Sequence, residues 1–322
     1  MNSALFHRPQ ALRNTHNRPG RAAFRRSGKV SSVEGAGHDP EHEPTSEDRQ
    51  HLAEVERWRA HRLARLRSPD GWLAVVGLSW LREGANEVGS APPCQVMLPK
   101  GTAHAGWIHV TPSGIIGTFD PEAGVTLDEQ PVGTVPLQPD DLGDPTQLDL
   151  GSVRFFVIRR QHDLAVRVRD AESPAIAAFT GIDIYPVDRR WRFEARFEPY
   201  EPERRAAVPT VLGGVETYPV PGALAFDRDG RTFRLDAFLE PGETDLFIVF
   251  GDLTNGSETY GGGRYVYAAP PDDRGMVTLD FNRAYNPPCA FTPFATCALP
   301  LPQNRLPFRV EAGEKGYRGP TA

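Results

Sequence analysis

The spacing of apolar residues predicts one long helix near the N-terminus. Between residues 46 and 67 they recur at roughly helical intervals, at Leu52, Val55, Trp58, Leu63 and Leu66. Thr45 and Asp48 have the spacing of a capping box, so the helix should begin near Ser46. The turn sequence SPDG at residues 68–71 should end it. The apolar run at residues 71–81 is too short to span a membrane and is expected to form a buried strand.

From about residue 86 the apolar residues alternate in short runs separated by turn residues, which is typical of a β-sandwich or barrel. The first group of runs covers residues 94–98, 107–111, 115–119, 125–127, 132–137, 147–150, 153–159 and 164–169. The second group covers residues 191–197, 215–220, 223–226, 232–238, 246–250, 264–268 and 276–281. Beyond Asn282 the chain is Pro-rich and irregular. We therefore predict a mainly β protein in which two β units follow one N-terminal helix.

The same pattern divides the chain into four segments. We predict a disordered tail at residues 1–45, the helix and apolar segment at 46–80, a β-sandwich at 81–170, and a second β-sandwich or barrel-like unit with a Pro-rich wrap at 171–322. The tail is predicted because residues 1–30 hold seven bases and no acid, and residues 31–50 hold six acids, without apolar periodicity. A solvated tail, a start codon assigned too early and an organellar transit peptide all fit it. Because no apolar core of a secretory signal is present, a cytoplasmic location is expected.

Composition narrows the function classes. The hydrophobic fraction of 39% supports a buried core, and 31 glycines with 31 prolines favour turns and short strands over helix bundles. A net charge of −6 argues against nucleic acid as a partner, and the lack of a long apolar run argues against a membrane. Three cysteines are too few for a disulfide scaffold.

Histidine distribution excludes several catalytic arrangements in the last third of the chain. All nine histidines lie at or before residue 162, so a His-based triad or zinc site there would need His104, His109 or His162 to fold across. No GxSxG, P-loop or HExxH motif is present. We expect no metal and no cofactor, and whether the chain is an enzyme stays open.

Polar residues of the last third form the candidate site. The candidate ligand-binding residues are Arg264, Asp280, Asn282, Tyr285 and Asn286, and the candidate catalytic residues are Asp280, Glu258 and Tyr260. Asp280 and Asn282 should share one strand face, and Arg264 on a neighbouring strand could pair with Asp280. Three hypotheses follow: a pocket for a small polar or anionic ligand, a hydrolase-like enzyme using carboxylates and tyrosine, or side chains that only satisfy backbone groups of an irregular segment in a structural or protein-interaction module.

Cys289 and Cys297 are eight residues apart in a segment interrupted by prolines. Buried thiols, a disulfide or redox pair, and part of a metal site are all consistent with this spacing.

Longer motifs resemble a known family. They are FGDLTNGSETY (residues 250–260), GRY (263–265), LDFNRAYNPPCAFTPFATC (279–297), PQNRL (302–306) and EAGEK (311–315). Over about residues 50–318 the chain resembles DUF1684, a bacterial family of unknown function. Ala298 departs from the proline that is usual there. The resemblance implies a shared fold and no particular activity.

Residues 84–160 resemble a forkhead-associated (FHA) β-sandwich more weakly. The resemblance lies in EVGS (residues 87–90), CQVML (94–98), AHA (103–105), LDEQPV (127–132) and LDLGSVRFF (148–156). The family's phosphate-binding Arg, Ser and Asn would fall at Ser90, Gly101 and Asp128. Because the arginine is missing and Asp128 would repel a phosphate, phosphopeptide binding is not expected. His104 is expected to tie two loops together.

Overall fold

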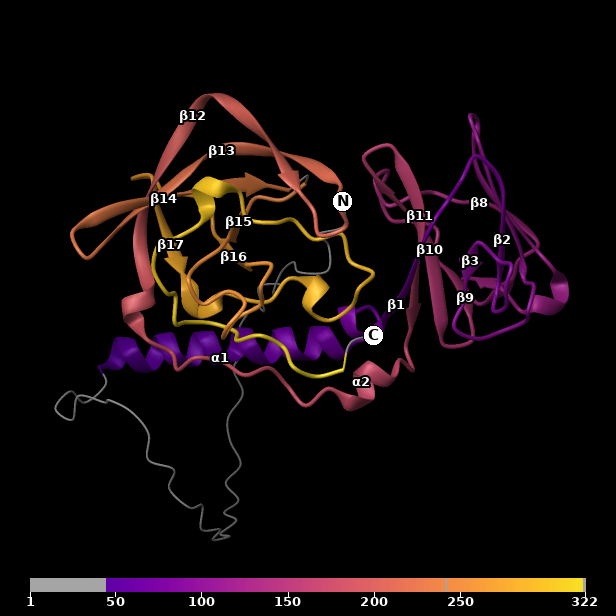
Figure 1. The fold of residues 1–322 in the computed structure, drawn as a ribbon, viewed down its shortest axis with the longest axis horizontal. Helices are drawn as coiled ribbons and strands as arrows, with labels where there is room; N and C mark the ends of the chain where they lie inside the picture. Colours follow the sequence, from indigo (N-terminus) through magenta and orange to yellow (C-terminus); the bar gives the residue numbers. More distant parts are fainter. Residues whose placement is uncertain (1–44, 241, 321–322) are drawn as a thin grey trace, which may run out of the picture.

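The structure is a computed structural model that describes residues 45–240 and 242–320. Figure 1 shows a β-sandwich and a larger β unit side by side, with the long helix α1 lying along the larger unit. The predicted disordered tail lies outside the described residues as far as residue 44. None of the described helices is long and apolar enough to cross a bilayer.

The elements follow the expected order. The helices are α1 (Ser46–Arg67) and α2 (Pro174–Ala178), with 3₁₀ turns η2 (Trp72–Ala74), η3 (Pro121–Ala123), η4 (Arg189–Trp191), η5 (Phe281–Arg283), η6 (Pro288–Ala290) and η7 (Pro302–Asn304). The strands of the sandwich are β1 (Val75–Trp80), β2 (Gly84–Gly89), β3 (Val96–Met97), β4 (Gly106–Thr111), β5 (Gly114–Phe119), β6 (Thr126–Leu127), β7 (Gln130–Pro131), β8 (Thr134–Pro136), β9 (Leu148–Leu150), β10 (Val153–Arg160) and β11 (Asp163–Asp170). The C-terminal strands are β12 (Arg192–Pro209), β13 (Val215–Arg228), β14 (Arg231–Leu239), β15 (Leu246–Phe250), β16 (Arg264–Ala268) and β17 (Met276–Asp280).

The sandwich consists of two sheets that share one core. One sheet has the order β1-β11-β10-β9-β6-β7 and the other β3-β2-β4-β5-β8. Alternate apolar residues of both sheets, such as Ile108, Phe119, Phe155 and Val168, meet in this core because successive side chains of a strand point to opposite faces. Strand β1 pairs with β11, so the sandwich includes the apolar segment that follows α1.

The C-terminal unit is one six-stranded sheet with the order β16-β15-β14-β13-β12-β17. Its apolar face buries residues from every strand, including Leu224, Leu235, Ile248, Val266 and Leu279. The predicted runs at residues 215–220 and 223–226 are one continuous strand, and β12 extends to Pro209, far beyond the predicted end at residue 197. The prediction of a mainly β fold with one long N-terminal helix is confirmed.

Helix α1 belongs with the C-terminal unit through buried polar contacts. Thr45 caps it in the predicted capping box with Asp48. His51 Nε2 lies 2.8 Å from Asp280 Oδ2, and Arg62 forms a buried ion pair with Glu314. These contacts join the helix to the end of β17 and to the last segment of the chain, which are more than 200 residues away in sequence.

Candidate functional site: the cleft between the two units

A cleft of about 530 Å³ lies between the sandwich and the C-terminal unit. The sandwich contributes the end of β10, the middle of β11 and the loop before β9; the C-terminal unit contributes β13, β15, β16 and the irregular segment near residues 285–298. Trp72, in the turn that follows α1, also lines it. This volume is in the range of small-molecule sites, which often form between domains.

Arg167 on β11 is the most unusual group of the cleft wall. Its side chain is buried, with 2% exposure, although it carries a charge. Within residues 45–240 and 242–320, no group accepts a hydrogen bond from its Nε or Nη2. The guanidinium lies 5.1 Å from the centre of the Trp72 ring. Burial, followed by the neighbouring Arg160 and Arg169, lowers the pKa of Arg167 to about 9, so at neutral pH it stays charged.

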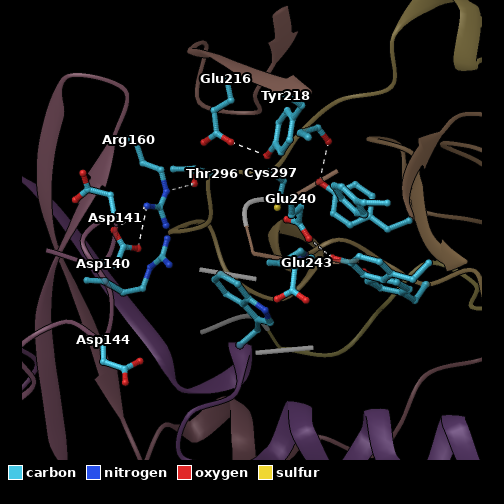
Figure 2. Close-up of a pocket in the computed structure, with 18 of the residues that line it drawn as sticks. Asp140, Asp141, Asp144, Arg160, Glu216, Tyr218, Glu240, Glu243, Thr296 and Cys297 are labelled. Atoms are coloured by element: carbon cyan, nitrogen blue, oxygen red, sulfur yellow. Dashed lines mark hydrogen bonds and ion pairs between the residues drawn. The ribbon is translucent and has the colours of Figure 1, made fainter. Parts of the chain in front are cut away.

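Arg160 on the neighbouring strand contrasts with Arg167 because it has an acidic partner. Its Nη1 donates to both carboxylate oxygens of Asp140, at 3.1 and 2.9 Å, and its Nε donates to Thr296 across the cleft at 3.3 Å. Figure 2 shows Arg160, Asp140 and Asp141 on one side of the cleft and Thr296 beyond them. Asp140 forms an ion pair with Arg160, whereas Arg167 has no ion pair in the described part of the chain, although Asp140 also acts on its charge.

The opposite wall carries carboxylates and aromatic rings. Glu216 accepts a hydrogen bond from Tyr218 at 2.7 Å, and Glu240 accepts one from Tyr267 at 2.6 Å (Figure 2). The rings of Tyr267 and Tyr285 are stacked with their centres 6.2 Å apart. Burial raises the pKa of Tyr218 and Tyr285, so these phenols stay protonated and act as donors or acceptors of hydrogen bonds. The sandwich wall of the cleft therefore carries Arg160 and Arg167 beside Asp140, Asp141 and Asp144, and the opposite wall carries carboxylates and aromatic rings.

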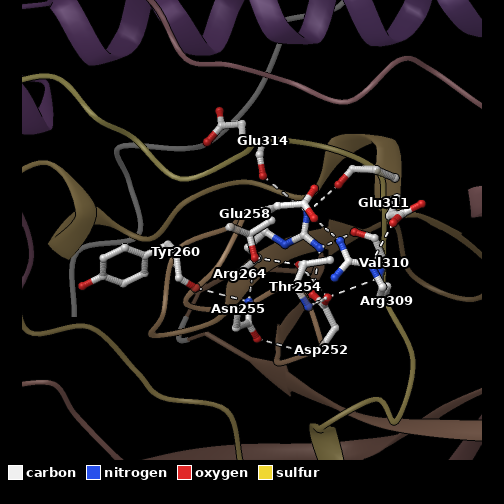
Figure 3. Close-up of polar contacts among 12 residues, drawn as sticks. Asp252, Thr254, Asn255, Glu258, Tyr260, Arg264, Arg309, Val310, Glu311 and Glu314 are labelled. Carbon is white, nitrogen blue, oxygen red and sulfur yellow. Dashed lines mark hydrogen bonds and ion pairs between the residues drawn. The ribbon is translucent and has the colours of Figure 1, made fainter. Parts of the chain in front are cut away.

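Arg264, the first of the sequence-predicted residues, lies in a separate and fully buried network (Figure 3). Its Nη2 donates to Asp252 Oδ2 at 2.8 Å and to the carbonyl of Val310 at 2.7 Å, and its Nη1 donates to the carbonyl of Ala312. Both charged side chains have 0% exposure. This guanidinium fastens the C-terminal segment to β16 by satisfying carbonyl groups that no strand pairs.

The expected pairing of Arg264 with Asp280 does not form. Their strands, β16 and β17, stand at opposite ends of the hydrogen-bonded order and do not pair with each other. Asp280 instead contacts His51 and accepts hydrogen bonds from the backbone and side-chain nitrogens of Asn282, at 3.0 and 2.8 Å. The histidine that reaches this region is His51, and not His104, His109 or His162 as expected, because α1 carries it across the molecule.

The remaining candidates lie in two places. Asn286 donates from its backbone to Glu314 and from its side chain to the carbonyl of Lys315, both at 2.7 Å. Tyr285 is the predicted residue that lines the cleft, and its ring lies under the guanidinium of Arg62 at 4.3 Å. Ligand binding by the other four predicted residues stays a prediction.

The candidate catalytic residues lie in different networks. Glu258 accepts hydrogen bonds from Tyr185 and Arg309, which lower its carboxyl pKa. Tyr260 donates to the carbonyl of Cys289 at 3.3 Å, and burial raises its pKa. Asp280 is held by His51 and Asn282. A carboxylate already bound to cations and a phenol with a raised pKa are poorly prepared for proton transfer near neutral pH.

Cys289 and Cys297 are free thiols, and Cys297 lines the cleft. The backbone N–H of Cys289 donates to Cys297 Sγ at 3.1 Å. The hydrogen bond to Cys297 lowers the pKa of the Cys289 thiol, and burial raises that of Cys297 well above its usual value. The structure therefore agrees with the interpretation of the two cysteines as free thiols. Cys297 is buried and Cys289 is half-buried.

Sequence reasoning missed Arg160 and Arg167. Arg167 lies in the middle of a predicted strand, and Arg160 directly follows another; both have buried apolar neighbours. The available signal was the alternation of β11, which places Arg167 and Arg169 on the same face as the apolar Ala165. A charged residue in a run that is buried on both faces is a reason to expect a site.

Fold and cleft define a two-unit, mainly β protein with a polar cleft between its units. Residues 177–315 match the model of the family described as "Protein of unknown function (DUF1684)". This match confirms the family resemblance. The FHA-like resemblance of the sandwich stays a prediction. No curated protein matches the chain.

The chain is similar in part to a solved structure of another protein. It is the solution NMR structure of the uncharacterized protein from gene locus rrnAC0354 of Haloarcula marismortui, which is 33% identical, with a TM-score of 0.37. The similarity covers 42% of this chain and 77% of that chain. Neither its title nor the family description names a ligand or an activity.

Proposed function

We propose that this protein binds a small organic molecule in the cleft between its units and holds an anionic group of that molecule against Arg167. The observation that carries the proposal is the buried Arg167 guanidinium, whose Nε and Nη2 have no acceptor among the described residues. Trp72 adds a second donor on the same wall, since its indole Nε1 is likewise buried and without a partner in the described part of the chain.

Electrostatics favour an anion at this wall. A buried charge without a partner costs several kcal/mol in desolvation. An anion entering the cleft would offset this cost, and charge-assisted hydrogen bonds contribute about 1.5–3 kcal/mol each. Arg160 is a weaker binding group for the anion, because its charge is already paired with Asp140.

The opposite wall restricts the ligand further. Glu216, Glu240 and Glu243 line it, so a polyanion would experience repulsion of about 1–4 kcal/mol for each close like-charged pair. A monoanion with a cationic or hydroxyl-bearing end fits both walls. The stacked rings of Tyr267 and Tyr285 provide an apolar surface for the body of such a molecule. Zwitterions and polar monoanions are therefore the expected class.

A thermal-shift screen tests the proposal. The panel contains zwitterions such as taurine and amino acids, monocarboxylates, the dianion sulfate and the polyanion ATP. We expect monoanions or zwitterions to raise the melting temperature and ATP to have little effect. For a hit, calorimetric affinity should fall about 10–100-fold in Arg167→Gln, which loses the charge-assisted contacts.

Arg169→Gln is the matched control. Arg169 is also buried and lies on the same strand, but it pairs with Asp70 at 3.3 Å and lines a different hollow. Affinity for the hit should be unchanged in this variant. A panel without any anionic hit, or a hit whose affinity is equal in the parent and Arg167→Gln, would contradict the proposal.

A further inference from the structure

A second group of side chains with metal-binding chemistry lies in the sandwich, away from the cleft. Glu87 on β2, Cys94 before β3 and His104 before β4 each point one ligand atom into the same space, and these atoms lie within 4.8 Å of one another. In the part of the chain that the structure describes, this is the one such group of three or more His, Cys, Asp or Glu side chains.

The backbone around this group is fixed by hydrogen bonds. The N–H of Ser90 donates to Thr102 at 3.0 Å, and the N–H of Ala105 donates to Val88 at 2.7 Å. Gly89 permits the close approach, because a Cβ at this position would lie 2.1 Å from the Ala103 carbonyl oxygen and 2.8 Å from Cys94 Sγ. The loop of residues 90–104 is thereby pressed against β2, which keeps the three side chains together in the folded protein.

We propose that Glu87, Cys94 and His104 bind a zinc ion. Thiolate, imidazole and carboxylate are the three ligand types of protein zinc sites. Bond lengths of about 2.0–2.3 Å in a tetrahedron place ligand atoms about 3.3–3.8 Å apart, which small side-chain rotations reach from the present positions. One thiolate and one carboxylate balance the two charges of Zn²⁺, and the thiol proton leaves to solvent when the metal binds.

Asp120 completes the surroundings of the imidazole. His104 Nδ1 faces Glu87 Oε1 at 2.8 Å, while Nε2 faces Asp120 Oδ2 at 3.6 Å. A carboxylate on the far nitrogen is the usual partner that fixes the ring of a metal-binding histidine. The side chains of His104 and Glu87 are 36% and 25% exposed, so a fourth coordination position is open to water. Asp120 is thus a positioning residue.

Cobalt substitution tests the proposal on the full-length protein. After chelator treatment, the protein is titrated with Co²⁺ and then with Zn²⁺. We expect one equivalent of Co²⁺ to give a thiolate-to-cobalt charge-transfer band and the visible bands of tetrahedral cobalt, both removed by one equivalent of Zn²⁺. Histidines elsewhere in the chain give no thiolate band.

Variants assign the site. Cys94→Ser should abolish the charge-transfer band, whereas Cys289→Ser, the control thiol, should keep it. His104→Gln should weaken zinc binding by more than the roughly 10–100-fold that Asp120→Asn causes. His109→Gln, on the neighbouring strand, should have no effect. X-ray absorption of the parent zinc complex should show one sulfur and two or more nitrogen or oxygen neighbours of the zinc ion. Because this measurement uses the unmodified protein, it does not depend on whether the variants fold.

Two results would overturn the proposal. One is a parent protein without the charge-transfer band or without sulfur at the zinc edge. The other is a band that persists in Cys94→Ser and disappears in Cys289→Ser, which would place the metal at the other thiols.

Discussion

The guanidinium carbon of Arg167 lies 5.1 Å from the centre of the Trp72 ring, where strand β11 of the sandwich meets the segment leading out of α1. This contact joins the two units at the wall of their shared cleft. Arg264, the other large arginine that is fully buried, contacts an acid and three carbonyl groups instead. The two arginines therefore have different roles, and their variants should behave differently.

Replacing each arginine by methionine separates these roles. Arg264→Met leaves Asp252 buried with 0% exposure and without its cation, which should destabilise the protein by about 3–5 kcal/mol. Arg167→Met removes a buried charge that has no ion pair, which should stabilise the protein, and a cation–π contact worth about 0.5–2 kcal/mol, so the substitution should be neutral or stabilising. Urea denaturation of both variants measures the difference. Equal destabilisation by the two substitutions would show that Arg167 is a structural group, as Arg264 is.

Anion binding in the cleft should depend on pH. The charged guanidinium binds the anion, and the pKa of Arg167 is lowered to about 9, first by burial and then by Arg160 and Arg169. Affinity should therefore be constant from pH 7 to 8 and fall about tenfold at pH 10, because charge is lost as pH rises through the pKa. Asp140 and Cys297, which also face Arg167, act in the opposite direction.

A sulfonate ligand suits this measurement because its own charge does not change. The cleft tyrosines should not interfere, since burial raises the pKa of Tyr218 and Tyr265 well above the usual value. Calorimetry at each pH gives the profile, with Arg167→Gln as the control that should be flat over this range. A parent profile as flat as that of the control would remove Arg167 from the binding step.

Local patterns predicted most of the fold because its strands are short and half-buried. The hairpin of β10 and β11 was predicted within one residue at each end, since it alternates cleanly and encloses a turn. The second half of β12 was not, because Pro199, Pro202 and a run of charged residues interrupt any alternation there. Residues 201–205 of β12 are all exposed, so burial imposes no pattern on that stretch of sequence.

The candidate site was harder to predict because its residues come from distant parts of the chain. Of the residues predicted from the sequence, Tyr285 lines the cleft and Arg264 belongs to a buried polar network in the last third of the chain. Sequence reasoning assigned the polar residues of this third the wrong partners, since Asp280 meets His51 from 229 residues away. Arg167 fell inside a predicted strand and Arg160 directly after one, and neither was given a role. Whether a buried charge is paired depends on tertiary contacts. The spacing of residues along the chain does not predict these contacts.

The ion pair between Arg62 and Glu314 should fasten α1 to the C-terminal unit. Both side chains are 4% exposed, and Arg62 Nη2 also donates to the carbonyl of Asn286 at 2.9 Å. Either Arg62→Gln or Glu314→Gln leaves a buried charge uncompensated and should cost about 3–5 kcal/mol. The double variant should cost less than the sum, with a coupling energy of about 0.5–3 kcal/mol. Additive effects in urea denaturation would show that the pair does not act as a unit.

The three thiols should differ in reactivity with iodoacetamide at pH 8. Cys289 is half-buried, and its hydrogen bond to Cys297 lowers its pKa, so it should have the largest thiolate fraction and react first. Cys94 and Cys297 are buried, and burial raises the pKa of both, so they should react slowly. Mass spectrometry of peptides after timed labelling gives each rate. In denaturant all three should react at similar rates, because each thiol is then exposed to solvent and has its ordinary pKa. Labelling of Cys297 before Cys289 would contradict the difference in pKa between the two thiols. If only one thiol reacts after unfolding without reductant, the other two form a disulfide and are not free.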